Sequence, residues 1–205
     1  MTVQDVKPTR SELIELKRKI KLSESGHKLL KMKRDGLILE FFEILKKAKT
    51  VRAELDEQFI SSMEKINVAK SVEGIVTVKS TAFSFKDTPR LEVESKNVMG
   101  VVVPKIESSS IKKDINERGY GIIGTSSRID EAAEAYENLV DKIILAAEIE
   151  TTIKKLLDDI EKTKRRVNAL EFKVIPELSE ARDFIILRLD EMERENTFRL
   201  KRIKA

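Results

Sequence analysis

Residues 13–55 read LIELKRKIKLSESGHKLLKMKRDGLILEFFEILKKAKTVRAEL. Steps of alternately three and four residues through this stretch land on an apolar side chain at ten of thirteen positions. A repeat of this period is a heptad seam, narrower than the apolar stripe of a globular helix, and it predicts one face of a coiled coil. Past Leu55 we expect the seam to continue through Phe59, Met63 and Ile66, with an extra four-residue step that locally unwinds the supercoil.

The helix start is predicted from PTRSE, residues 8–12, where Thr9 or Ser11 serves as the N-cap and an acidic residue occupies the first turn. Residues 127–204 repeat the seam and keep it on both sides of Pro176. We therefore expect one continuous, bent helix there. The bend has a local cause, because a proline cannot donate the hydrogen bond to the carbonyl of Phe172.

At about 1.5 Å per residue the two helices would span roughly 90 and 115 Å, and neither can bury its seam alone. Pairing them through a compact connection predicts an antiparallel two-helix coiled coil, with both chain ends at one tip and the longer C-terminal helix projecting there. The predicted domains are an N-terminal helix (10–70), a central head (71–126) and a C-terminal helix (127–204). The predicted seam residues are Leu13, Leu16, Ile20, Leu30, Leu37, Phe41, Ile44, Val51, Leu55, Ile153, Ile160, Val167, Val174 and Ile185.

The central segment has a different character from its flanks. GIVTV (74–78) is a short β-branched run, RLEVE (90–94) alternates, and VMGVVVP (98–104) follows across residues 95–97. These runs predict a small β-hairpin flanked by loops. The predicted fold class is therefore mainly α, with a β-hairpin head between two long helices.

Composition limits the classes of function. Charged residues make up 37% of the 205 residues and aromatic residues 5%, a mixture typical of long helices rather than of a large globular core. The chain has no cysteine, which excludes disulfide or thiolate chemistry and favours an intracellular protein. No signal peptide and no run of about 18 apolar residues is present, so we expect membrane association only through a partner. Both termini are basic and the middle is acidic.

Two features could suggest a reaction site. GYGIIG (119–124) matches the dinucleotide fingerprint G-x-G-x-x-G, but no buried strand precedes it and no βαβ pattern follows, so we interpret it as a turn before a helix N-cap. His27 is the only histidine and cannot make a zinc site without other strong ligands. It falls on the seam, where polar residues usually fix register or meet a partner. We expect no catalytic residue, no metal site and no cofactor.

Gly26 and Gly36 interrupt the first helix, at a cost of about 1 kcal/mol each relative to alanine. Two interpretations remain open. The long helix tolerates them, or their bare backbone lets another chain approach closely.

Three stretches together resemble the D subunit of archaeal A-type and related V-type rotary ATPases. They are PTRSELIELKRKIKLSESGHKLLKMKRDGLILEFF (8–42), TKRRVNALEFKVIPEL (163–178) and LDEMERENTFRLKRIK (189–204). The resemblance implies a central-stalk rotor shaft, a non-catalytic component that couples proton or sodium movement to ATP synthesis or hydrolysis.

The resemblance also implies partners and a location. The partners are the catalytic A and regulatory B subunits of the hexamer, the F subunit, and the funnel-shaped C subunit on the rotor ring, with no nucleic acid. The location is the cytoplasmic face of the cell membrane, as a peripheral part of the complex. The tip residues expected to contact the collar of the hexamer are Arg10, Glu12, Phe198, Arg199, Leu200 and Ile203.

A coiled-coil scaffold or tether whose basic tip binds nucleic acid or a membrane surface is the alternative. Under the shaft hypothesis, Pro176 bends the helix so that its faces act unequally on the three catalytic sites.

Overall fold

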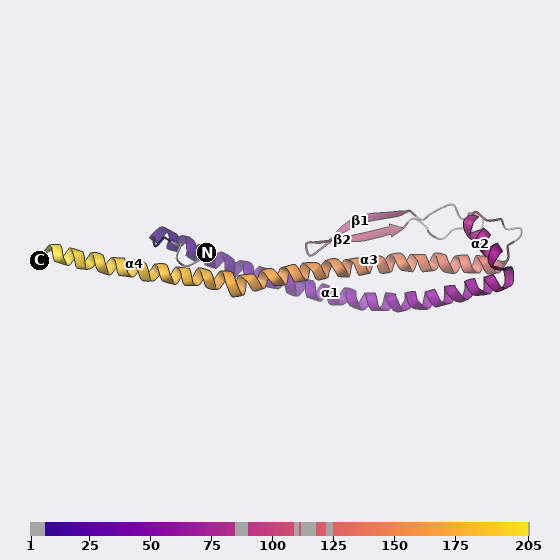
Figure 1. Cartoon of the computed structure of the whole chain (residues 1–205), viewed down its shortest axis with the longest axis horizontal. Coiled ribbons are helices and arrows are strands. Elements are labelled where there is room, and N and C mark those ends of the chain that lie inside the picture. The colour runs from indigo at the N-terminus through magenta and orange to yellow at the C-terminus, as the bar shows by residue number, and fades with distance from the viewer. Residues whose placement is uncertain (1–6, 85–89, 109–110, 112–117, 122–124, 205) are drawn as a thin grey trace. The chain divides into compact units, whose positions relative to one another are not determined.

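The computed structural model describes residues 7–84, 90–108, 111, 118–121 and 125–204. Its elements follow in the order α1 (Arg10–Glu73), α2 (Ile75–Ser84), β1 (Leu91–Val98), β2 (Val101–Ser108), α3 (Ser127–Ala169), the π-helical turn η3 (Leu170–Val174) and α4 (Ile175–Lys204) (Figure 1). The prediction of a mainly α protein with a long helix towards each end and a small β-hairpin between them is confirmed.

Helix α1 runs for 64 residues between two well-defined caps. Of the two predicted N-caps, Thr9 is the one used: its Oγ1 accepts the backbone N–H of Glu12 at 3.2 Å, which satisfies one of the free donors of the first turn. The helix ends at Gly74, whose φ of 84° is the left-handed conformation that a helix C-terminus commonly adopts.

The interpretation of GIVTV as part of a β-structure is wrong, because Ile75–Ser84 form the helix α2. β-branched residues disfavour a helix only slightly, and tertiary contacts outweigh that preference here. Val78 packs against a buried cluster that contains Ala69 and Ile129. Thr81 is buried and donates its hydroxyl hydrogen to the carbonyl of Thr77 at 2.9 Å.

Strands β1 and β2 form an antiparallel hairpin with a one-to-one register from Leu91↔Ser108 to Val98↔Val101. Residues 95–97, between the two predicted runs, belong to β1, and the turn of the hairpin lies at Met99 and Gly100. Their φ values of 50° and 85° are those of a two-residue type I′ turn, which matches the twist of a hairpin. Asn97 closes the turn by accepting the backbone N–H of Gly100 on its Oδ1 at 2.8 Å.

The chain divides into two compact units, and each contains a pair of helices. Unit 1 comprises residues 1–38 and 159–205, and unit 2 comprises residues 39–158. In unit 1 the helices are antiparallel, since partners along α1 meet residues of decreasing number. The contacts are Arg10 with Glu193, His27 Nε2 with Glu171 Oε2 at 3.5 Å, and Lys33 Nζ with Asp159 Oδ2 at 3.2 Å.

Unit 2 pairs the second half of α1 with α3 in the same antiparallel sense. Arg52 Nη1 lies 3.1 Å from Glu150 Oε1, and Glu54 forms an ion pair with Lys142. Further along α1, the hydroxyl of Ser62 donates to the carbonyl of Ala135 at 3.2 Å. The hairpin belongs to the same unit and lies beside α3 (Figure 1).

Apolar burial rather than ion pairing holds each pair of helices together. Most of the interhelical ion pairs are solvent-exposed, and exposed pairs contribute about 1 kcal/mol or less. In unit 1 one buried cluster contains Leu16, Ala181 and Ile185. Leu37 in unit 1 and Leu156 in unit 2 are completely buried. Full burial of one leucine contributes about 1.5–3 kcal/mol, so a short series of seam residues outweighs all the exposed ion pairs.

The helix passes through Pro176 without a break, as expected, but with a feature that the sequence pattern does not reveal. Residues 170–174 form a π-helical turn in which the N–H of Ile175 bonds to the carbonyl of Leu170, five residues back. Pro176 has no N–H and so cannot make the next hydrogen bond of this kind. The π-helical turn therefore ends at Val174, with Ile175 as its cap. The bend expected at Pro176 remains a prediction.

Candidate interaction surfaces

The described residues contain no group of three or more His, Cys, Asp or Glu side chains that could hold a metal ion. In the same part of the chain, no helix is long and apolar enough to cross a membrane. Three residues of the GYGIIG stretch, 122–124, lie outside the described residues. Residues 118–120, around its first glycine, form bends rather than a strand.

The predicted seam residues are all buried or half-buried. Leu16, Ile20, Leu37, Val167 and Ile185 are buried; Leu13, Leu30, Phe41, Ile44, Val51, Leu55, Ile153, Ile160 and Val174 are half-buried.

Past Leu55 the seam differs from the expected path. Phe59 and Met63 are 49% and 39% exposed, whereas Ser62 is completely buried. Here the helices keep the heptad step, so a serine takes the buried position, and its hydroxyl is satisfied by the carbonyls of Gln58 and Ala135. A search for apolar residues alone cannot find a seam position of this kind.

His27 lies on the seam of unit 1, with 18% of its side chain exposed. Its Nε2 atom is buried and makes no hydrogen bond to any described group, although Glu171 Oε2 is 3.5 Å away. A Cβ atom placed on the neighbouring Gly26 would meet nothing within 4 Å. The backbone at Gly26 is therefore open to an approaching group.

A buried ionic cluster in unit 2 was not anticipated from the sequence. The Arg118 side chain, 7% exposed, donates to both carboxylate oxygens of Glu137, at 3.1 Å each, and to the carbonyl of Asp130 at 3.3 Å. The Tyr120 hydroxyl bonds to the Asp130 carboxylate. Asp130 and Glu137 are seven residues apart and lie on one face of α3. This spacing predicts that the two carboxylates share a face, but it does not predict that Arg118 pairs with them.

These contacts change proton affinity in a consistent direction. Burial alone would lower the pKa of the Arg118 guanidinium, but hydrogen bonds with Tyr120 and Glu137 outweigh it and raise that pKa. Burial, together with the hydrogen bond to Asp130, raises the pKa of the Tyr120 hydroxyl, against the opposing effect of Arg118. The cluster therefore keeps Arg118 charged and Tyr120 neutral, and it anchors residues 118–120 onto α3.

The tip of unit 1 carries a basic and apolar surface. Every residue of α4 from Asp190 to Lys204 is exposed. This stretch includes Glu193, which forms an ion pair with Arg10, and continues for eleven residues beyond it. Phe198, Leu200 and Ile203 are 72%, 65% and 80% exposed. Of the other predicted tip residues, Arg199 lies 3.5 Å from Glu195 Oε2 and Glu12 forms part of the α1 cap. Apolar side chains this open to water, set among cations, indicate a surface that another molecule covers.

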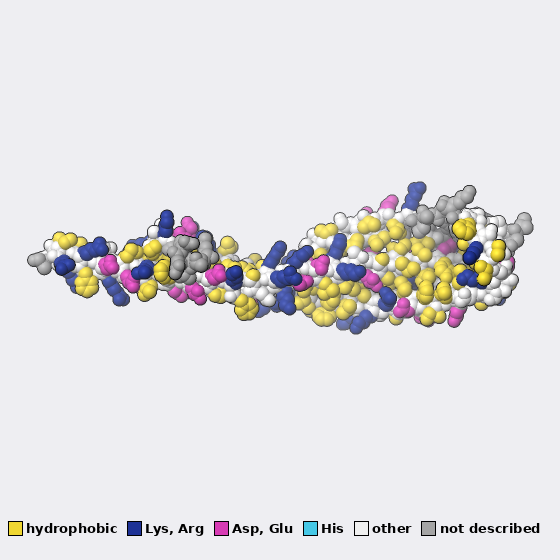
Figure 2. Space-filling model, in the orientation of Figure 1, with side chains coloured by type: hydrophobic (Ala, Val, Ile, Leu, Met, Phe, Trp, Pro, Cys, Tyr) yellow, Lys and Arg dark blue, Asp and Glu magenta, His cyan; other side chains and the backbone are white. Residues whose placement is uncertain are grey.

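A second apolar surface lies on unit 2, where hydrophobic side chains gather on the visible face (Figure 2). Exposed apolar side chains of this unit include Leu39, Phe42 and Ile60 of α1, at 70%, 54% and 59%, and Ile143 of α3, at 45%. Between the two helices runs an open groove of about 430 Å³. It is lined by Ala48, Lys49, Val51, Arg52, Ala53, Asp56, Ala146, Ile149 and Glu150. Exposed apolar area of this kind marks protein interaction sites.

Paired long helices with two exposed apolar surfaces define a helical-hairpin protein of the kind that works as one component of an assembly. Comparison with known proteins identifies which kind. The family model for the D subunit of ATP synthase matches residues 12–205, and the chain belongs to that family.

Its relatives are similar along their whole length. The A-type ATP synthase D subunit of Methanococcoides burtonii is 75% identical, with 100% of this chain and 99% of the relative aligned. Proteins of the same name from Methanosarcina mazei and Halobacterium salinarum are 69% and 54% identical. Their alignments cover 100% and 98% of this chain and 98% and 90% of those proteins.

Proposed function

We propose that the chain is the central-stalk rotor shaft of an A-type ATP synthase, a non-catalytic component that transmits torque between the ion-translocating ring and the catalytic hexamer. Membership of the D-subunit family supports the assignment to the complex. The observation that carries the mechanical part is the buried interhelical seam, which is present in both units.

The seam suits this task because torque would otherwise unwind or bend a single helix. Side chains packed between two antiparallel helices resist sliding and twisting at every turn, since interiors packed at crystal-like density deform little. In unit 1, Leu16 packs with Ala181 and Ile185; in unit 2, Ala69 packs with Ile129 and Ala132. The 64-residue α1 contributes to both units without interruption.

The tip of unit 1 is proposed to enter the collar formed by the A and B subunits. Apolar Phe198, Leu200 and Ile203 would slide against the ring, while the cations near them face its polar groups. Because Phe198 is 72% exposed, Phe198→Ala should leave the unfolding of the isolated chain unchanged and lower ATP hydrolysis coupling in the complex. A loss of stability in the isolated chain would show that Phe198 serves the fold instead.

The apolar surface of unit 2 is proposed to receive the F subunit, and the C subunit of the rotor ring is the further partner. Under this proposal the chain lies at the cytoplasmic face of the membrane and is held there by the complex.

Asymmetry is also part of the proposed mechanism. A shaft must present different surfaces to three equivalent catalytic sites, and η3 with Pro176 breaks the regular helix on one side of unit 1 only. Altered helix geometry at that point would make the faces of the tip act unequally on the ring.

A rotation experiment tests the torque proposal directly. The natural chain has no cysteine, so Ser71→Cys at an exposed position of α1 offers a single attachment point for a bead. With the hexamer fixed to glass, ATP should drive unidirectional rotation of the bead. A bead that stays still while ATP is hydrolysed would overturn the proposal. Salt-sensitive binding of the free chain to DNA or anionic vesicles, without incorporation into the synthase, would favour the tether.

A further inference from the structure

The two edges of the hairpin differ. The outer edge of β2 is closed by two local features. Pro104 has no N–H to offer, and the N–H of Ile106 donates to Glu148 Oε2 of α3 at 3.2 Å. Proline and contacts with a covering helix are the means by which proteins protect a strand edge from pairing.

The outer edge of β1 has no such protection. In a hairpin closed by a two-residue turn, Val98 and Val101 exchange hydrogen bonds, and every second pair does so. The intervening pairs direct their N–H and C=O groups away from the hairpin. The pair of Val93 with Ile106 is an example, because the N–H of Ile106 donates outward to Glu148. The outward-facing residues of β1 are Leu91, Val93, Ser95 and Asn97.

All four of these residues are exposed, and no backbone hydrogen bond joins them to any described residue outside the hairpin. Strand β1 contains no proline, and its one-to-one register contains no bulge. An eight-residue open edge of this kind is a template for an additional strand.

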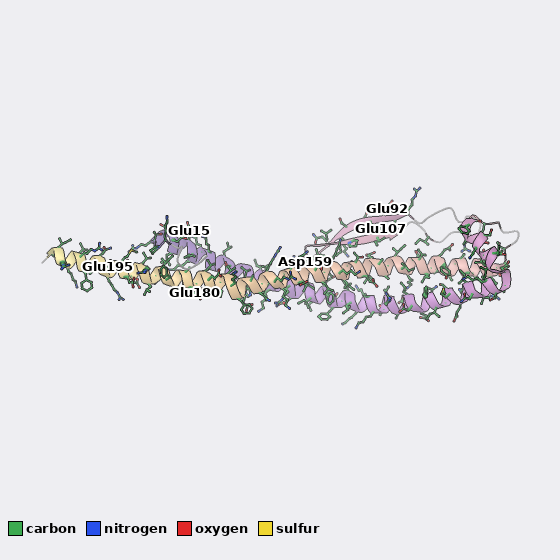
Figure 3. The ribbon with its side chains drawn as sticks, viewed as in Figure 1. Glu15, Glu92, Glu107, Asp159, Glu180 and Glu195 are labelled. Carbon is green, nitrogen blue, oxygen red and sulfur yellow. The ribbon has the colours of Figure 1, made fainter. Side chains whose placement is uncertain are left out.

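The side chains of β1 specify the chemistry of that strand. On one face, Leu91 and Val93 are 49% and 67% exposed. Glu92 and Glu94 lie on the opposite face, together with Glu107, the cross-strand partner of Glu92 (Figure 3). Successive residues of an added strand would therefore meet an apolar surface and a carboxylate in alternation.

The second face also carries Lys96 of β1 and Lys105 and Glu107 of β2. Lys105 lies opposite Glu94, but its Nζ is already 2.5 Å from Glu107 Oε1. The charged side chains of this face on β1 itself, next to the open edge, are therefore the carboxylates of Glu92 and Glu94, followed by Lys96.

We propose that the open edge of β1 receives an extended segment of another component of the synthase, which adds a third strand to the hairpin and alternates apolar with basic residues. The apolar residues cover Leu91 and Val93, and the basic residues pair with Glu92 and Glu94. The inference takes from the proposed function only that the chain works inside an assembly.

A peptide that carries this pattern tests the edge on the isolated full-length chain. The probe is the acetylated and amidated peptide Thr-Glu-Thr-Lys-Val-Arg-Val. In the antiparallel orientation it places arginine and lysine opposite Glu92 and Glu94, and glutamate opposite Lys96. Its control has lysine at the acidic position and glutamate at both basic positions. We expect the probe to bind at least about tenfold more tightly than the control by fluorescence anisotropy, because three like-charge pairs oppose the control.

Two matched proline variants locate the binding. Val93→Pro removes an outward N–H of β1 that the hairpin does not use, and should weaken probe binding by at least about tenfold. Val102→Pro makes the same change at an outward position of β2 and should change binding by less than about twofold. The double variant Glu92→Lys with Glu94→Lys should reverse the preference between the two peptides, a result that misfolding cannot produce.

Several outcomes overturn the inference: no binding of the probe to the natural chain, equal binding to the two proline variants, or an unchanged preference in the double variant. A chain dimer that Val93→Pro abolishes also overturns it, because the occupant is then a second copy.

Amide hydrogen exchange extends the test to the complex. In the isolated chain the amides of Leu91, Val93, Ser95 and Asn97 should exchange fast, while those of Glu92, Glu94 and Lys96 are slowed by β2. In the assembled synthase all seven should be slow. Fast exchange of the outward four in the complex contradicts the inference and leaves the shaft proposal intact, whereas absence of the chain from the purified synthase contradicts the shaft proposal itself.

Discussion

Two neighbouring leucines of α3 test whether the interhelical seam stabilises this protein. Leu156 is completely buried and Leu157 is 46% exposed. Both are leucines of α3 and both belong to unit 2. Replacing either with alanine removes the same three carbon atoms and improves helix propensity by the same small amount.

The expected costs differ because the environments differ. For Leu156→Ala the lost transfer free energy is about 2.4 kcal/mol, at about 0.8 kcal/mol per buried carbon. The cavity left between two helices adds to this, so the total falls within the range of about 2–5 kcal/mol. Leu157→Ala loses about half of the transfer term and leaves no enclosed cavity, so its cost should be about 1 kcal/mol or less.

Urea unfolding followed by helical circular dichroism measures both variants. With a slope of about 2 kcal/mol per molar urea, Leu156→Ala should lower the midpoint by about 1–2.5 M and Leu157→Ala by about 0.5 M or less. The slope should stay the same in the two variants. If Leu157→Ala costs as much as Leu156→Ala, then the isolated chain does not pair its helices as described, and the seam cannot be the element that carries torque.

Three further predictions concern the ionic cluster and the proline. Glu137→Gln removes the closer counter-charge of the buried Arg118 and leaves only Asp130 Oδ1, 3.9 Å from its Nη1, so it should cost about 3 kcal/mol in urea unfolding. Glu134→Gln at an exposed neighbouring position should cost less than about 0.5 kcal/mol, and equal costs would refute a stabilising role for the cluster. The raised pKa of Tyr120 means that its stabilising contribution is complete below the unfolded value of about 10 and is lost as the pH rises through the folded value. The stability of the natural chain should therefore fall more steeply above pH 10 than that of Tyr120→Phe, and parallel curves would exclude the effect. Pro176→Ala restores an N–H to the helix and should raise the unfolding midpoint while it straightens the helix and lowers coupling; normal coupling with unchanged curvature in a crystal structure would refute the asymmetry hypothesis.

Much of the fold was predictable because its main signal is local. A seam of period 3.5 through residues 13–55 depends only on the order of residues along the chain, and it correctly predicted long helices. The hairpin was also predictable from alternation, but the position of its turn was not. The left-handed conformation that closes the turn is adopted by Met99 and Gly100, whereas the polar residues 95–97 belong to β1.

The predicted tip residues and seam residues came from pattern and resemblance, and the structure adds their exposure. What pattern could not supply were contacts between distant parts of the chain. Ser62 is buried because Ala135 accepts its hydroxyl, and Arg118 is buried because Glu137 neutralises it; neither partner is signalled by spacing.

The amino-acid sequence by itself determined that this protein forms long, cysteine-free, highly charged helices with an apolar seam, because helical periodicity and composition are properties of neighbouring residues. Only the tertiary structure decided which residues fill that seam beyond Leu55, that α2 is a helix, and which edge of the hairpin stays open. Those outcomes depend on contacts between segments far apart in the chain, where packing and hydrogen bonding outweigh local preference.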